Sequence, residues 1–179
     1  LFYLCLQQIT VLGVAEIWQR FVDGMIDSSW WERIAVVAGI ASVWFSRKEN
    51  ILVYPVGLIN TIIYIWLSLK GHLPGEAAVN FYYTVMSIYG WMLWTKRDAQ
   101  HHPVINISFS DRKWWGYQVL FFLCFYVILF FSLSFLKTGF FPESIPWADS
   151  FASATAFTGM WLMTKKKVES WYWWIITNI

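Results

Sequence analysis

The 179-residue sequence has little charge and little cysteine, and each shortage excludes a class of protein. Charged residues make up 13% of the chain and the formal net charge is +2, which is too small for a nucleic-acid-binding surface. The two cysteines, Cys5 and Cys124, lie in apolar stretches without a CxxC motif or metal-ligand spacing, so neither a disulfide framework nor a metal site is indicated. We therefore expect no nucleic-acid partner, no metal and no cofactor.

Catalytic motifs and charges at membrane depth are missing as well. The sequence contains no P-loop, HExxH or GxSxG motif, and its three histidines lie in predicted loops. The acidic residues of the predicted core helices, such as Glu32 and Asp149, lie at helix starts and not in the middle. Because proton relays and sites for charged substrates usually need ionisable groups inside the membrane, we expect neither an enzyme nor a proton-coupled carrier. A neutral or weakly charged aromatic solute that moves by facilitated diffusion fits better.

Apolar and aromatic residues dominate the composition. Hydrophobic residues make up 58% of the chain and the mean hydropathy is +0.48, so a soluble fold of this length would expose far too much apolar surface. The sequence therefore predicts an integral membrane protein that has the lipid bilayer as its solvent. Its 14 Trp, 9 Tyr and 15 Phe exceed what two interfacial aromatic belts need, which predicts an interior surface for a flat solute.

Seven apolar segments are candidates for membrane-spanning helices, which need about 20 residues. They cover residues 2–21, 33–46, 51–69, 77–94, 114–135, 147–163 and 170 onward. The first contains Gln7, Gln8 and Glu16, so it is either an accessory span or an interfacial helix. The last would rise only about 15 Å before the sequence stops, half the thickness of the hydrocarbon layer. We therefore expect this chain to be a fragment of a longer protein.

Residues 30–62 are echoed without gaps by residues 147–179, at an offset of 117 positions. The identical pairs are Trp30 and Trp147, Ala35 and Ala152, Trp44 and Trp161, Lys48 and Lys165, Ile59 and Ile176, and Ile62 and Ile179. Six identities are weak evidence alone, but both copies run from an aromatic and acidic start through an apolar stretch and a lysine-containing break to a second apolar stretch. Duplicated helical units of this kind are typical of transporters.

The repeat predicts an all-α membrane fold with a core of three helices, one linker helix and three helices. Residues 1–29 form an accessory amino-terminal helix and loop, 30–97 the first three-helix repeat, 98–146 the linker region with its central helix at 114–135, and 147–179 an incomplete second repeat that lacks its carboxy-terminal helix. A single linker helix makes the two repeats parallel about an axis along the membrane normal, which is the arrangement of SWEET transporters.

Basic residues divide unequally between the two predicted sides of the membrane. One side carries Arg47, Lys48, Lys96, Arg97, Arg112, Lys113, Lys165, Lys166 and Lys167, and the other carries Arg20, Arg33, Lys70 and Lys137. By the positive-inside rule, the Lys-rich loops are predicted to be cytoplasmic.

Eight polar or aromatic residues inside predicted helices are candidates for solute recognition. They are Asn60, Asn80, Tyr83, Ser87, Gln118, Trp171, Trp174 and Asn178. Trp171, Trp174 and Asn178 are spaced i, i+3 and i+7, which places two indoles and a carboxamide on one helix face. A buried amide in lipid needs a partner, so such residues face the bundle or a cavity. Hydrogen bonding between helices is the alternative for any one of them, and an interfacial belt is the alternative for Trp171, but four such faces together favour a cavity.

Three stretches of the sequence form recognisable motifs: ENILVYPVGLIN at 49–60, YGWMLW at 89–94 and ESWYWWIITN at 169–178, of which the last contains the most specific part, Trp-x-x-Trp-x-x-x-Asn. Together they resemble the PnuC-type vitamin transporters, specifically the nicotinamide riboside branch. The resemblance covers residues 30–179. It departs from the family pattern at position 54, where Tyr stands in place of Trp, and the sixth core helix stops at Ile179.

The resemblance implies uptake of nicotinamide riboside, an NAD precursor, across the bacterial inner membrane, and retention through phosphorylation by a cytoplasmic riboside kinase. Trp171, Trp174 and Tyr83 would then face the cationic pyridinium ring. The four amides would bind the carboxamide and the ribose, and one repeat would rock against the other to give alternating access. A thiamine or riboflavin carrier of the same fold, a SWEET-like sugar carrier, a membrane-embedded enzyme and a non-transporting scaffold are the alternatives. The sequence leaves a homo-oligomer open.

Overall fold

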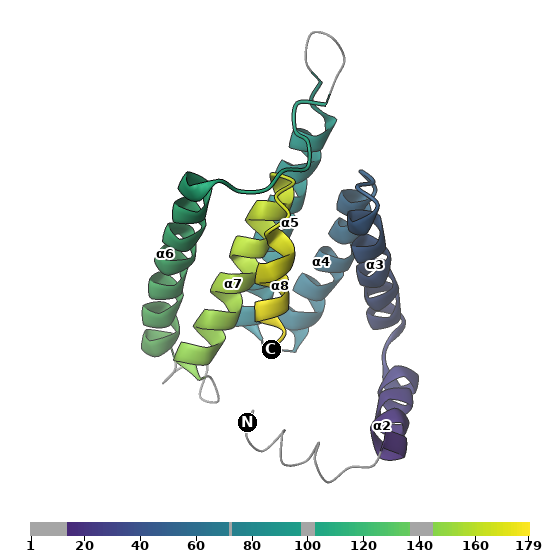
Figure 1. Cartoon of the computed structure of the whole chain (residues 1–179). Helices are drawn as coiled ribbons and strands as arrows, with labels where there is room; N and C mark the ends of the chain where they lie inside the picture. Colours follow the sequence, from purple (N-terminus) through teal and green to yellow (C-terminus); the bar gives the residue numbers. More distant parts are fainter. Residues whose placement is uncertain (1–13, 72, 98–102, 137–144) are drawn as a thin grey trace.

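The computed structural model describes residues 14–71, 73–97, 103–136 and 145–179, and these residues form an all-helical bundle (Figure 1). The helices are α2 (Val14–Asp27), α3 (Trp30–Arg47), α4 (Val53–Lys70), α5 (Pro74–Thr95), α6 (Arg112–Leu136), α7 (Pro146–Thr164) and α8 (Ser170–Thr177). The expectation of an all-α protein is confirmed, and the six predicted core segments correspond to α3 through α8.

The described helices differ in how well they suit a membrane span. By length and apolar composition, α4 and the stretch Arg112–Phe135 within α6 are each able to cross a bilayer. The segment predicted at 2–21 overlaps only the start of α2, which continues to Asp27, and residues 1–13 lie outside the described part of the chain.

Acidic residues at the start of the two repeat copies act as helix caps. The Ser29 hydroxyl accepts a hydrogen bond from the Glu32 backbone N–H at 3.3 Å, and the Ser29 N–H donates to the Glu32 carboxylate, so the pair forms a capping box ahead of α3. At the corresponding place before α7, the Ile145 N–H donates to Asp149 Oδ2 at 2.8 Å. The paired acids thus satisfy backbone donors that a helix start leaves open.

The bundle consists of two groups of helices joined through its centre. In one group α4 packs against both α3 and α5, and in the other α7 packs against both α6 and α8, while α5 and α7 connect the groups (Figure 1). Tyr82 and Phe157 mark this junction, because their rings stack at 4.0 Å and the Tyr82 hydroxyl donates to the Phe157 carbonyl at 3.1 Å. Small buried residues such as Ala154 and Gly159 on α7 let the neighbouring helices approach closely.

The basic side chains assigned to one side by the sequence flank helix ends that lie together. The carboxyl ends of α3, α5 and α7 and the amino end of α6 lie at the upper end of Figure 1, which we call the basic end of the bundle. A short backbone pairing of Ser108 with Lys167 links the segment before α6 to the turn before α8 at this end.

Contacts at the basic end join residues that are 117 positions apart. The Ser46 hydroxyl lies 3.5 Å from the Met163 sulfur, and the Lys166 ammonium lies 3.5 Å from the Glu49 carboxylate. Glu49 and Lys166 also share a left-handed backbone, with φ of 52° and 53°. Equivalent residues of two repeats can contact each other only close to the rotation axis that relates the repeats. In the register of the predicted repeat, which stays a prediction, these pairs are equivalent residues.

Candidate solute-binding cavity

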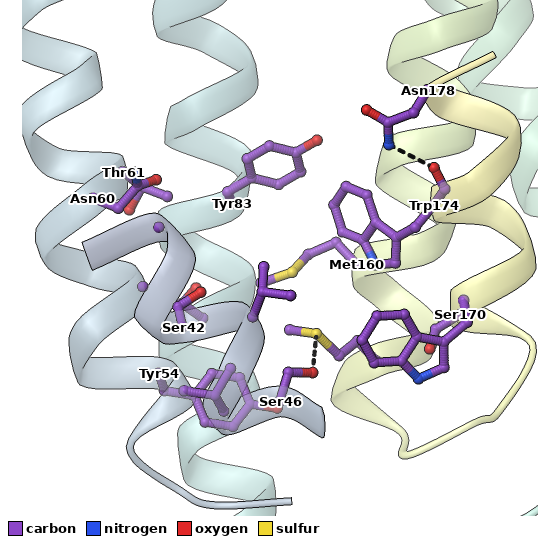
Figure 2. A pocket seen from close by; sticks show the side chains of 17 residues that line it. Ser42, Ser46, Tyr54, Asn60, Thr61, Tyr83, Met160, Ser170, Trp174 and Asn178 are labelled. Carbon is purple, nitrogen blue, oxygen red and sulfur yellow. Dashed lines mark hydrogen bonds between the residues drawn. The ribbon is translucent and has the colours of Figure 1, made fainter. Parts of the chain in front are cut away.

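A cavity of about 450 Å³ lies between the two groups of helices (Figure 2). Residues from α3, α4, α5, α7 and α8 form its wall, so both groups contribute to it. The lining residues are Gly39, Ser42, Val43, Ser46, Val53, Tyr54, Gly57, Asn60, Thr61, Tyr83, Ser87, Met160, Met163, Ser170, Trp171, Trp174 and Asn178. This volume falls in the usual range for a site that binds a small molecule.

The structure brings six of the eight predicted recognition residues to this cavity. They are Asn60, Tyr83, Ser87, Trp171, Trp174 and Asn178. Asn80 is not part of the wall, and its amide nitrogen donates to the Glu76 carbonyl within α5 at 3.0 Å. Gln118 is fully buried on α6 and also lies away from the wall.

Gln118 belongs to a buried hydrogen-bond network that holds the start of α8. Its amide donates to the Ser110 hydroxyl at 2.7 Å and accepts from the Trp173 indole at 3.0 Å. Ser110 in turn donates through its N–H and its hydroxyl to the Glu169 carboxylate, at 2.7 Å and 2.9 Å. Glu169 is only 2% exposed and directly precedes α8. The network therefore anchors the helix that carries Trp171 to the segment before α6.

The aromatic wall is built around Trp174. A Cβ atom added to Gly159 on α7 would lie 3.3 Å from the Trp174 indole, so the glycine provides the space in which the indole packs. The Tyr83 ring, from the other group of helices, lies 5.9 Å from the Trp174 ring at an angle of 51°. Trp171 is 43% exposed and lies at the edge of the cavity, whereas Trp174 is half-buried. Two indoles of unequal burial thus offer π faces to a solute.

Two of the lining amides are fixed by backbone carbonyls. The Asn60 amide nitrogen donates to the Ala35 carbonyl on α3 at 2.7 Å, which ties α4 to α3. The Asn178 amide nitrogen donates to the Trp174 carbonyl at 2.7 Å. Since the nitrogen of each amide is engaged, its oxygen is the atom best placed to accept a further hydrogen bond.

The 117-residue offset of the predicted repeat relates lining residues that helix spacing alone did not identify. Each lining residue of the second copy has its counterpart, 117 positions earlier, in the same wall. The pairs are Val43 and Met160, Ser46 and Met163, Val53 and Ser170, Tyr54 and Trp171, Gly57 and Trp174, and Thr61 and Asn178. Applying the offset to the predicted face of α8 would have identified three missed residues, Tyr54, Gly57 and Thr61.

Charged side chains are not part of the described wall. None of its seventeen residues is Asp, Glu, Lys, Arg or His, and the described chain has no cluster of three His, Cys, Asp or Glu side chains able to hold a metal ion. The described wall therefore offers indole and phenol rings, amides and hydroxyls, and no charged group.

Comparison with known proteins places these features in a family. A family model described as nicotinamide mononucleotide transporter matches residues 29–179. The nicotinamide riboside transporter PnuC of Escherichia coli is 24% identical over 176 residues, which cover 87% of this chain and 74% of the relative. The nicotinamide riboside transporter PnuC of Neisseria mucosa is 26% identical over 164 residues, which cover 84% of this chain and 57% of the relative.

A solved structure has the same fold. The crystal structure of the vitamin B3 transporter PnuC matches with a TM-score of 0.68 and 23% identity, over 89% of this chain and 68% of that chain. The PnuC resemblance read from the sequence is confirmed at the level of the family. The family model covers most of the chain, so this protein belongs to the nicotinamide mononucleotide transporter family, which includes the PnuC transporters, and is a transporter and not an enzyme.

Proposed function

We propose that this protein carries nicotinamide riboside by facilitated diffusion through the cavity between its two groups of helices. The observation that carries the proposal is the composition of the cavity wall. Indole faces, amides and hydroxyls line it, and no charged side chain does so among the described residues. Nicotinamide riboside has a matching composition, because it combines a flat cationic ring, a carboxamide and a sugar with several hydroxyls.

The pyridinium ring is proposed to bind at Trp174, with Trp171 and Tyr83 beside it. A cation over an indole face is attracted by the quadrupole of the ring, and the attraction grows when water is excluded. Trp174 is the more buried of the two indoles and lies close to Tyr83, so it provides the main platform. Gly57, at the repeat position that corresponds to Trp174, lines the same cavity and adds no side chain to it.

The polar groups of the solute are proposed to bind the amides and hydroxyls of the wall. The oxygens of Asn60 and Asn178 are suited to accept from the carboxamide, and Ser87 adds a buried hydroxyl. Of the eight residues predicted from the sequence, we therefore propose the six in the wall as solute contacts. Asn80 and Gln118 are proposed to support the helices instead, because their amides are engaged elsewhere.

The riboside fits this cavity better than its phosphorylated form, the mononucleotide. A phosphate carries up to two negative charges and would need basic partners in a desolvated site. Lys166 and Lys167 line a separate, smaller pocket of about 80 Å³ at the basic end. Lys166 pairs there with Glu49 at 3.5 Å, and Lys167 donates to the Ser108 hydroxyl at 2.9 Å. Both ammonium groups thus already have partners outside the main cavity.

Transport is proposed to occur by rocking of the first three-helix repeat against the second. Contacts between the groups lie at the basic end, and they include Ser46 with Met163, Trp94 with the Thr164 carbonyl at 3.2 Å, and Lys165 with the Tyr89 hydroxyl at 2.7 Å. Separation of these contacts would open the cavity to that side. By the charge asymmetry, the basic end would face the cytoplasm of a bacterial inner membrane.

Retention of the solute would depend on chemistry outside the carrier. A carrier without a coupled ion equilibrates its solute across the membrane and cannot concentrate it. We propose that a cytoplasmic riboside kinase provides the direction, since a phosphorylated product is a poor fit for the uncharged cavity.

Calorimetric titration of the complete, detergent-purified protein tests the proposal. Nicotinamide riboside, nicotinamide mononucleotide, thiamine and riboflavin should be titrated side by side. Binding of the riboside alone, weakened in Asn178→Ala, supports the assignment. If thiamine or riboflavin binds and the riboside does not, the fold assignment stands but the solute is another vitamin. A preference for the mononucleotide would contradict the argument from the uncharged wall.

A further inference from the structure

Tyr54 contributes a buried hydroxyl to the cavity wall. It is the second residue of α4, its side chain is 0% exposed, and it is one of the lining residues. Within the part of the chain that the structure describes, its hydroxyl oxygen has no hydrogen-bond partner. A buried hydroxyl without a partner is costly, so such groups in native proteins bind water or a ligand.

Packing fixes the position of the Tyr54 ring. The ring meets Trp94 edge to face, with centroids 5.0 Å apart and planes at 85°. Its other neighbour is the backbone of Gly90 on α5, where an added Cβ atom would overlap both the ring and the hydroxyl oxygen. The ring is therefore confined between α4 and α5. Because the ring cannot swing away, its hydroxyl stays beside Gly90, next to the cavity wall that the Tyr54 side chain helps to form.

The surroundings of this hydroxyl differ from those of the lining amides. Figure 2 shows Tyr54, Ser46 and Ser170 at one end of the cavity, and Asn60 and Asn178 at the other. Hydroxyl side chains lie at both ends, since Thr61 and Tyr83 lie toward the amides, but the two carboxamides of the wall lie at one end alone. A solute that carries a carboxamide at one end and a hydroxylated part at the other can match this difference in one orientation.

We propose that the Tyr54 hydroxyl forms a hydrogen bond with the sugar of the bound solute and thereby fixes which end of the solute faces the basic end of the bundle. The inference rests on the proposed function, since it takes a riboside as the solute. A phenol hydroxyl both donates and accepts, as ribose hydroxyls do, so either partner can supply the proton. Tyr54 is the repeat counterpart of Trp171, and a Trp at this place would offer only a donor.

The first test is Tyr54→Phe in the complete protein, titrated with nicotinamide riboside. Loss of one buried hydrogen bond should weaken binding about three- to tenfold. The melting temperature without solute should stay the same or rise, because the unpaired hydroxyl is removed while the ring stays packed. Tyr117→Phe is the matched control, since Tyr117 is exposed on α6 outside the cavity, and it should change neither quantity. Unchanged riboside affinity in Tyr54→Phe would overturn the proposal.

The second test identifies the part of the solute that Tyr54 contacts. The 2′-, 3′- and 5′-deoxy forms of nicotinamide riboside each lack one sugar hydroxyl. We expect one of them to bind wild type and Tyr54→Phe equally, because its missing hydroxyl is the partner. If all three still bind Tyr54→Phe more weakly than wild type, the contact is not to the sugar. If wild type binds thiamine or riboflavin and no riboside, the proposed function is refuted instead. The affinity of Tyr54→Phe relative to wild type would then be measured with that vitamin, and equal affinities would show that the Tyr54 hydroxyl does not contact the solute.

Discussion

Replacement of Trp174 by alanine tests how the cavity holds a cationic ring. The substitution removes the half-buried indole that packs at Gly159 and faces Tyr83. A cation over a desolvated indole is stabilised by about 2 kcal/mol. At about 1.4 kcal/mol for each factor of ten, the dissociation constant of nicotinamide riboside should rise roughly thirtyfold in Trp174→Ala. Trp174→Phe keeps a smaller π face and should give an intermediate value.

Burial predicts a smaller effect for the second indole. Trp171 is 43% exposed, and an exposed cation–π contact contributes only about 0.5–1 kcal/mol. Trp171→Ala should therefore raise the dissociation constant by about two- to fivefold. The structure predicts that Trp174→Ala raises the dissociation constant more than Trp171→Ala does. The sequence spacing alone does not distinguish the two indoles.

Calorimetry on detergent-purified variants measures these values, and thermal unfolding shows that each variant is folded. Trp115→Ala is the control, because Trp115 is similarly exposed, at 42%, but lies on α6 outside the cavity wall. It should leave the affinity unchanged. A larger loss in Trp171→Ala than in Trp174→Ala, or a loss below threefold in Trp174→Ala, would refute the assignment of Trp174 as the main platform.

Three further changes probe the packing, the basic end and the network at α8. Gly57→Ala should keep or raise the melting temperature, because its Cβ meets only a side chain at 3.7 Å and alanine favours a helix. Gly90→Ala should lower stability by about 1–3 kcal/mol, because its methyl overlaps a buried tyrosine ring, and equal melting temperatures for the two variants would contradict this. In a background without native cysteines, the pair Ser46→Cys and Met163→Cys should cross-link under oxidation and stop uptake until a reductant is added. Full uptake by the cross-linked protein would show that this contact does not separate during transport. Gln118→Ala should lower stability by about 1–3 kcal/mol by leaving buried partners unpaired, and a loss of riboside affinity without a loss of stability would instead support a direct contact.

Helix positions could be predicted closely because polar breaks in an apolar chain are easily recognised. The break after Arg47 and the break after Thr164 both carry lysines, and both coincide with ends of helices. The start of α3 was predicted at residue 33, three residues later than in the structure. The capping box of Ser29 and Glu32 was the local signal for the correct start.

Predicted residues that share one helix face lie together in the cavity wall, and their role in solute recognition stays a prediction. The spacing of Trp171, Trp174 and Asn178 placed them on one face of α8, and the structure puts that face at the cavity. Spacing did not identify the surroundings of Gln118, because periodicity shows which residues share a face and not which neighbouring helix covers it. An amide can be satisfied by a buried network as well as by a solute. Its role depended on Ser110, which lies outside any predicted helix.

The remaining part of the wall follows from how the two repeat copies differ. Where one copy has Trp174 the other has Gly57, and both positions line the same cavity. Two tryptophans at these positions would fill much of the space between the helices, while two glycines would leave no π face for a ring. One indole and one glycine at these paired positions provide both a platform and the room to occupy it. On the proposed repeat and the proposed function, duplication would therefore account for a cavity at the junction of the two copies, and divergence at this pair would account for the room that it offers a flat solute.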